Sequence, residues 1–150
     1  MSNDVVLATR FGAESEGPAR VASKLARLTG GRVTIVYVAS ELNAVTAAAG
    51  EAGVQPAEER RVQLEEIQQE LRDFVTEHFS AMAADARVLE GDVAESISDV
   101  AAELGAAFLV VGTRGRSALS RLILGDTTHS ILQHAPCPVV VVPLHGTPGS

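Results

Sequence analysis

Short apolar runs recur along the chain, and longer polar or mixed stretches separate them. The runs are rich in β-branched residues and end at glycine, proline or a polar residue, a pattern typical of buried strands. They comprise DVVLAT at 4–9, RVTIVYVAS at 32–40, ARVLEG at 86–91, AFLVVG at 107–112 and VVVVP at 139–143. The sequence therefore predicts five strands, with the second fully buried.

Between these runs, apolar residues recur at three- and four-residue steps, which is the period of an amphipathic helix. Glycine after the last apolar position favours a helix end, and proline favours the first turn. The repeated positions are Val21, Leu25 and Leu28 before Gly30 and Gly31; Leu64, Ile67, Leu71, Phe74 or Val75, and His78 or Phe79 after Pro56; Ile97, Val100, Ala101 and Leu104 before Gly105; and a short helix in TTHSILQHA at 127–135.

Two local signals refine these boundaries. Asp92 and Glu95 have the spacing of a capping box, with Asp in the Ser/Thr place, and predict a helix from 93 to about 104. The stretch ELNAVTAAAGEAGVQ at 41–55 is small and polar with no clear period, so we expect a mobile loop there.

Strands that alternate with helices imply right-handed crossovers and a parallel sheet covered on both faces. The predicted fold class is therefore α/β, a single doubly wound domain over residues 1–144 with a five-stranded parallel sheet. Residues 145–150 are predicted to form a disordered tail. In open sheets of this class, ligands bind outside the carboxyl ends of the strands where strand order reverses, which directs attention to the loops after strands one and four.

Composition and charge exclude several classes of function. The formal net charge of −7 argues against a nucleic-acid partner, because such domains are usually basic or carry a basic face. The apolar runs are too short for a membrane helix, and the N-terminus does not have the features of a secretory signal. We therefore expect a cytoplasmic protein without a membrane partner, and the single Cys137 agrees because no intrachain disulfide can form.

The loop between the fourth and fifth strands differs in charge from the rest of the chain. Arg114, Arg116 and Arg121 lie there, and no acidic residue falls between Gly112 and Gly125. Such a loop attracts a small anion, although a solvated surface loop has the same composition. A phosphate loop of the G-x-x-x-x-G-K-[ST] type is excluded, since the chain's one lysine, Lys24, lies elsewhere.

Gly112, Gly115 and Gly125 have the spacing G-x2-G-x9-G and are followed by a polar helix start and HAPCPVVVVP at 134–143. Glycine allows close approach of the main chain to a ligand, and free N–H groups at the next helix start favour phosphate. In this combination and in element order the chain resembles the universal stress protein family. The resemblance implies a Rossmann-like, adenine nucleotide alpha hydrolase-like fold and binding of ATP, with the phosphates in this loop.

The resemblance also implies residues beside the base. Val38, after the second strand, matches the family's adenine-side valine, and Ala8 and Thr9 match the main chain next to the base. Two positions depart from the nucleotide-binding members. Arg10 stands where they have Asp after the first strand, and Asp126 stands where they have Ser or Thr after the last glycine.

Hydroxyl donors remain one position later, at Thr127 and Thr128, and Ala107 replaces an acidic residue that usually precedes the fourth strand. Two hypotheses follow. In the first, Arg10 and Asp126 form a salt bridge that partly fills the phosphate pocket. In the second, Arg10 binds phosphate in place of a metal, so that nucleotide binds without magnesium. AMP and a cyclic nucleotide stay open beside ATP, because an adenylate without a γ-phosphate lessens the conflict with Asp126.

The sequence favours a binding module over an enzyme. We expect no catalytic residue, and a weak ATPase is the enzyme alternative, with Asp126 as the acidic candidate near the loop. A third alternative is a non-nucleotide-binding signalling or scaffold protein with a closed pocket. The histidines do not have metal-ligand spacing, so no metal site is expected, and Cys137 reads as a packed thiol.

The last apolar run predicts a partner. An apolar edge strand left open is an aggregation hazard, and Pro143 alone does not blunt it. The resemblance implies a homodimer through this strand, formed by Val139, Val140, Val141 and Val142, in a two-fold antiparallel contact. The alternative is a strand covered by the chain's own helices.

Overall fold

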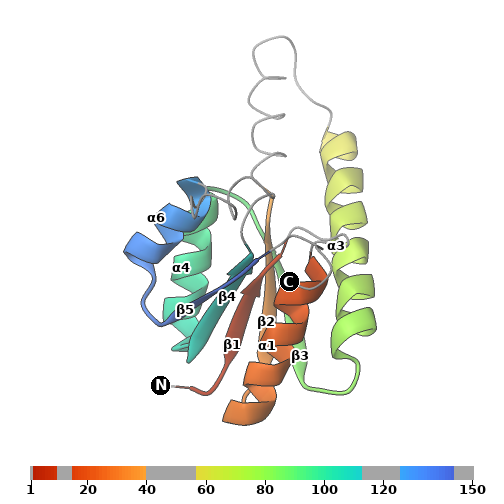
Figure 1. The fold of residues 1–150 in the computed structure, drawn as a ribbon. Helices are drawn as coiled ribbons and strands as arrows, with labels where there is room; N and C mark the ends of the chain where they lie inside the picture. The colour runs from red at the N-terminus through yellow and green to blue at the C-terminus, as the bar shows by residue number, and fades with distance from the viewer. Residues whose placement is uncertain (1, 10–14, 40–56, 113–125, 144–150) are drawn as a thin grey trace.

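The computed structural model describes residues 2–9, 15–39, 57–112 and 126–143. The expected loop at 41–55 and the expected tail at 145–150 lie outside these residues. The described elements follow one another as strand, helix, strand, and Figure 1 shows their arrangement. They are β1 (Val5–Ala8), α1 (Glu16–Thr29), β2 (Val33–Val38), α3 (Ala57–Phe79), β3 (Ala84–Leu89), α4 (Val93–Leu104), β4 (Phe108–Gly112), α6 (Asp126–His134) and β5 (Val139–Val142).

The strands form one parallel sheet in the order β3-β2-β1-β4-β5. Val5 is aligned with Val33 on β2 and with Phe108 on β4, so β1 lies at the centre with a neighbour on each side. The chain moves outward from β1 to β3, then returns to the other side of β1 as β4. Strand order therefore reverses between β1 and β4.

Helices cover both faces of the sheet (Figure 1), and each face has its own cluster of buried residues. α1 and α3 cover one face, where Val5, Leu7 and Ile35 are buried. α4 and α6 cover the other, where Val6 and Leu109 are buried. This alternation along β1 is what a strand buried on both sides requires, and it confirms the predicted doubly wound α/β class.

The predicted helix ends are confirmed in detail. α1 and α4 are followed by Gly30 and Gly105, with φ of 74° and 57°, and both glycine N–H groups donate back to the last turn. Positive φ favours glycine because a side chain would clash with the backbone. At the start of α4, the Asp92 carboxylate accepts a hydrogen bond of 2.9 Å from the Glu95 N–H, as the capping spacing predicts.

The predicted inward face of α1 is wrong in one respect. Small residues pack most closely against the sheet: Ala19, Ala22 and Ala26 are buried. Leu28, expected on the buried face, is 74% exposed. Alanine lets the helix axis approach the sheet closely. The alanines and the larger apolar residues both recur at three- to four-residue steps on adjacent sides of the helix, so periodicity alone did not show which side is buried.

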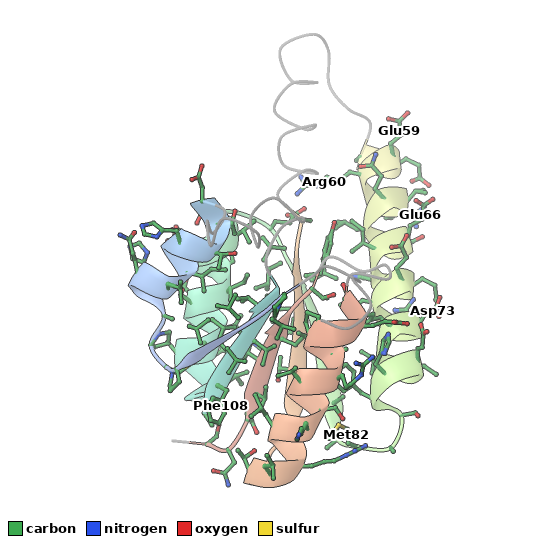
Figure 2. All side chains as sticks on the ribbon, viewed as in Figure 1. Glu59, Arg60, Glu66, Asp73, Met82 and Phe108 are labelled. Carbon is green, nitrogen blue, oxygen red and sulfur yellow. The ribbon has the colours of Figure 1, made fainter. Side chains whose placement is uncertain are left out.

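α3 is longer than the strand it covers, and only its second half supplies buried residues, Leu71, Phe74 and Phe79. Figure 2 shows Glu59, Glu66 and Asp73 on the outer side of this helix, away from the sheet, and all are exposed. The acidic residues on this outer side are exposed to solvent. In the described part of the chain, no helix combines the length and apolar character of a membrane span.

Candidate functional site

The candidate site lies at the carboxyl edge of the sheet, where β1 and β4 end side by side. After β1 the chain enters α1 on one face, whereas the helix after β4, α6, packs on the opposite face. Both helices therefore begin at this edge and direct their N-terminal N–H groups toward it. Such an edge suits an anionic group between the two strands.

Thr9 is fixed at the end of β1 by both main chain and side chain. Its N–H donates to the Val36 carbonyl at 3.0 Å, which continues the pairing of β1 with β2. Its hydroxyl is hydrogen-bonded to the Ser15 hydroxyl, with 3.0 Å between the oxygens. Both residues are buried, so this contact ties the start of α1 to the end of β1.

Ala8 and Val38 lie on neighbouring strands and on the same face of the sheet. Ala8 is aligned with Val36, two residues before Val38, and both candidate residues are half-buried against the core on the α4 and α6 side. Their small apolar side chains suit a planar ring rather than a charged group. The structure thus brings together two residues that the sequence assigns to the base side.

Asp126 begins α6 and is exposed. A carboxylate in the first turn of a helix is stabilised by the helix dipole, which gives Asp126 a structural role independent of any ligand. The two threonines that follow differ: Thr127 is exposed, whereas Thr128 is only 6% exposed. Thr127 is therefore the more accessible hydroxyl donor of the pair. Gly112, the last residue of β4, is aligned with Val142.

The remaining predicted site residues lie outside the described residues. They are Arg10, Arg114, Gly115, Arg116 and Gly125. The hypothesis of an Arg10–Asp126 salt bridge includes one of them and so stays a hypothesis.

Sequence reasoning missed Ser15, whose hydroxyl pairs with Thr9. The signal was present, because Ser15 precedes Glu16 and stands three residues before Pro18, a pattern typical of a helix start. Ser15 is the N-cap of α1, yet its side chain makes no capping bond and is directed to the end of β1 instead.

Cys137 lies in the packed environment expected for it. Cys137 is half-buried against the core, and burial raises the pKa of its thiol. A raised pKa leaves less thiolate at neutral pH, which lowers reactivity. His129 is exposed on α6. Over the residues with described positions, no group of three His, Cys, Asp or Glu side chains is arranged to hold a metal ion.

Comparison with known proteins identifies the fold and the family. The sequence model of the universal stress protein family matches residues 1–143. A universal stress protein of Mycolicibacterium smegmatis is 33% identical over 138 residues, which cover 89% of this chain and 45% of that protein. This chain spans less than half of the length of the curated relatives it matches.

Two solved structures share the architecture. The universal stress protein of Archaeoglobus fulgidus in complex with dAMP has a TM-score of 0.66 at 20% identity, covering 95% of this chain and 98% of that one. A universal stress protein in complex with cAMP has a TM-score of 0.67 at 20% identity, covering 96% and 98%. At this identity the likeness concerns the fold, whereas the match over residues 1–143 concerns the sequence itself. This chain belongs to the universal stress protein family.

Proposed function

We propose that this chain is a cytoplasmic stress-response module that binds an adenine nucleotide at the carboxyl edge between β1 and β4. The observation that carries the proposal is the reversal of strand order at that point, which leaves the ends of β1 and β4 and the starts of α1 and α6 together. Related structures contain dAMP and cAMP, so adenine nucleotides are the ligands to test.

In this proposal the base lies against Ala8 and Val38, whose half-buried apolar side chains share one face of the sheet. The main chain of Thr9, fixed at the end of β1, lies beside the base. The phosphates lie toward Gly112 and the start of α6, where the N–H groups of the first helical turn favour negative charge.

The phosphate end of the proposed site is non-standard, with Arg10 and Asp126 at positions where the resemblance implies Asp and Ser or Thr. The exposed Asp126 carboxylate repels a phosphate chain, and the repulsion grows with the number of phosphates. Arg10 supplies a forked guanidinium in compensation. The site therefore favours an adenylate with few phosphates, and it does not need magnesium as counter-charge.

Calorimetric titration with ATP, AMP and cyclic AMP, with and without magnesium, tests this proposal. We expect the wild type to bind AMP more tightly than ATP, and Asp126→Ser to raise ATP affinity by about tenfold, since one repulsive charge near the phosphates is removed. Asp73→Ser removes an exposed carboxylate from the outer side of α3 and is expected to leave the affinity unchanged.

Each other outcome has a definite meaning. Binding that strictly requires magnesium contradicts the role given to Arg10. Binding that appears only after Asp126 is replaced contradicts a working nucleotide site in the wild type and supports the closed-pocket, scaffold alternative. No binding by either protein overturns the nucleotide function altogether.

The proposal includes a homodimer through β5. β5 is one edge of the described sheet, and its four valines are all half-buried rather than covered. Antiparallel pairing with β5 of a second copy satisfies the edge and buries these side chains further. Sedimentation equilibrium of the wild type and of Val141→Lys tests it. We expect a dimer that becomes a monomer, and a monomeric wild type would contradict the contact.

A further inference from the structure

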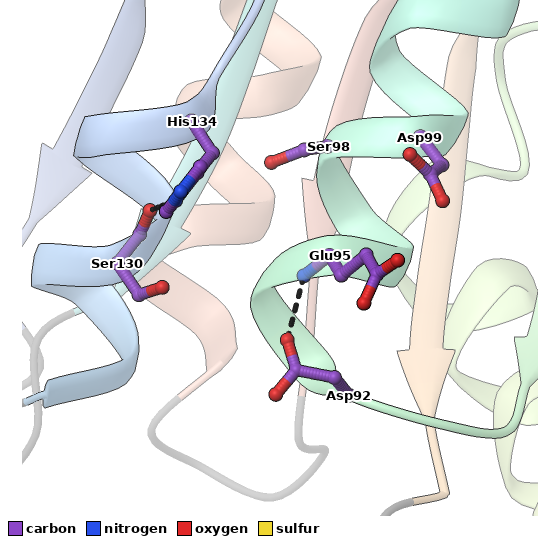
Figure 3. A pocket seen from close by; sticks show the side chains of 6 residues that line it. All are labelled: Asp92, Glu95, Ser98, Asp99, Ser130 and His134. Carbon is purple, nitrogen blue, oxygen red and sulfur yellow. Dashed lines mark hydrogen bonds between the residues drawn. The ribbon is translucent and has the colours of Figure 1, made fainter.

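A pocket on the opposite face of the sheet from α1 lies between α4 and α6, and the function proposed above does not use it. Figure 3 shows the side chains that line it, with those of α4 on one side and those of α6 on the other. Its volume is about 450 Å³. The lining residues are Asp92, Glu95, Ser98, Asp99, Ser130 and His134.

The α4 side of this pocket is acidic because of helical spacing. Asp92, Glu95 and Asp99 are separated by three and four residues, so they share one side of the helix. One oxygen of Asp92 accepts from the Glu95 N–H and caps the helix, but the Glu95 and Asp99 carboxylates are exposed. None of the residues lining the pocket is lysine or arginine.

The Ser98 hydroxyl supports a ligand site in this pocket. Ser98 is 8% exposed, and within the described ranges its Oγ is a buried polar atom that has no hydrogen-bond partner. Figure 3 shows this side chain directed from α4 toward α6, and Ser98 lines the same pocket as Glu95 and Asp99. A buried hydroxyl without a partner costs free energy, and a ligand that donates a hydrogen bond removes that cost.

The α6 side adds acceptors as well. The Nδ1 of His134 lies 2.8 Å from the Ser130 carbonyl oxygen, which accepts only, so Nδ1 is the donor of this bond. In the neutral ring, Nε2 is then an acceptor. The pocket thus combines carboxylates, hydroxyls and an imidazole nitrogen, a set that suits a ligand rich in N–H donors.

We propose that the α4–α6 pocket binds an organic ammonium cation. Inorganic metal is a poorer match, since the described His, Asp and Glu side chains do not gather in a group of three able to hold it. A flexible alkylammonium chain can reach carboxylates spaced along a helix and still donate to the buried Ser98 hydroxyl. The same chemistry is found in a free polyamine and in a lysine side chain of a partner protein.

Calorimetric titration with spermidine tests the proposal. A second arm uses a peptide that is acetylated at its N-terminus and contains a lysine with a free side-chain amine. We expect the double variant Glu95→Gln, Asp99→Asn to lower spermidine affinity by at least about tenfold, because two charged acceptors are lost. The matched control Glu66→Gln, Glu70→Gln removes two exposed carboxylates from α3 and is expected to leave the affinity within about twofold.

Ser98→Ala separates a site from a diffuse acidic surface. We expect it to lower spermidine affinity a few-fold while the unfolding temperature without ligand does not fall, since the hydroxyl it removes has no partner. Equal losses in the α4 and α3 double variants, or no binding of spermidine and peptide to the wild type, would overturn the proposal. Binding of the peptide alone supports it with a protein as the source of the ammonium group.

The pocket variants are independent of the nucleotide site. Glu95, Ser98 and Asp99 contribute nothing to the proposed adenine site, so AMP titration of the same variants is expected to match the wild type. Loss of spermidine binding with AMP binding kept therefore reports on the pocket alone, and the reverse pattern reports on the nucleotide site alone.

Discussion

The two edges of the sheet are built differently. At the amino edge, the segment before β1 is hydrogen-bonded to the turns that precede β2 and β4. Ser2 donates from its hydroxyl to the Leu104 carbonyl at 2.8 Å and from its N–H to the Gly105 carbonyl at 3.0 Å. The Asp4 carbonyl accepts from the Ala107 N–H at 2.8 Å, and its carboxylate accepts from the Arg32 N–H.

The carboxyl edge instead consists of strand ends and helix starts. It carries the last residues of β1 and β4, the exposed Asp126 and Thr127 at the start of α6, and the hydroxyl pair of Thr9 and Ser15. Contacts at the amino edge join segments far apart in sequence. At the carboxyl edge, α1 and α6 begin, and the first N–H groups of a helix have no partner within that helix. We infer that the amino edge serves mainly the stability of the fold and the carboxyl edge mainly binding.

The strongest test of this comparison is Gly31→Ala at the amino edge. A Cβ on Gly31 would lie 1.8 Å from the Asn3 carbonyl oxygen, which is backbone and cannot simply rotate away. We expect a loss of about 3 kcal/mol in the free energy of unfolding, measured by urea denaturation, because the segment before β1 must shift. Nucleotide affinity of the folded fraction is expected to stay unchanged.

Gly30→Ala is the matched control. Its Cβ would meet nothing within 4 Å, but φ of 74° disfavours a side chain, so we expect a smaller loss of about 1 kcal/mol. An equal or larger loss than for Gly31→Ala would show that close packing at the amino edge is not what limits stability.

Asp92→Ala tests whether a residue at the carboxyl edge can serve stability and not binding. Asp92 precedes α4 at the carboxyl edge, yet its carboxylate caps that helix. We expect the free energy of unfolding to fall by about 1 kcal/mol, with no change in AMP affinity. Asp92→Asn keeps a capping acceptor and is expected to remain close to the wild type. A large change in AMP binding would instead place Asp92 in the nucleotide site.

The sequence predicted the class, the strands and the helix ends because these depend on local signals. Apolar runs, the glycines after α1 and α4 and the spacing of Asp92 and Glu95 each act over a few residues. The predicted buried face of α1 was wrong at Leu28, since alanine contributes weakly to a hydrophobic pattern although it packs most closely.

The pocket between α4 and α6 could not be predicted in the same way. Its two sides are separated by β4 and by the glycine-spaced segment, and nothing in the pattern near Ser98 relates it to His134. Likewise, the Thr9–Ser15 contact depends on where α1 starts in space. In both cases the sequence shows which polar residues are present, but only the tertiary structure shows which of them lie next to one another.

Thr9→Val is the smallest and the most informative change, because Thr9 belongs to the proposed site and also makes a structural contact. The substitution keeps the shape and removes the hydroxyl that pairs with Ser15. We expect the free energy of unfolding to fall by only about 0.5 kcal/mol, since one neutral hydrogen bond is lost. AMP affinity is expected to fall several-fold, because the start of α1 loses this contact with the end of β1. Thr9→Ser keeps the hydroxyl and is expected to restore both quantities. If Thr9→Val lowers stability as much as Gly31→Ala and leaves AMP affinity unchanged, the division between a stabilising edge and a binding edge is wrong.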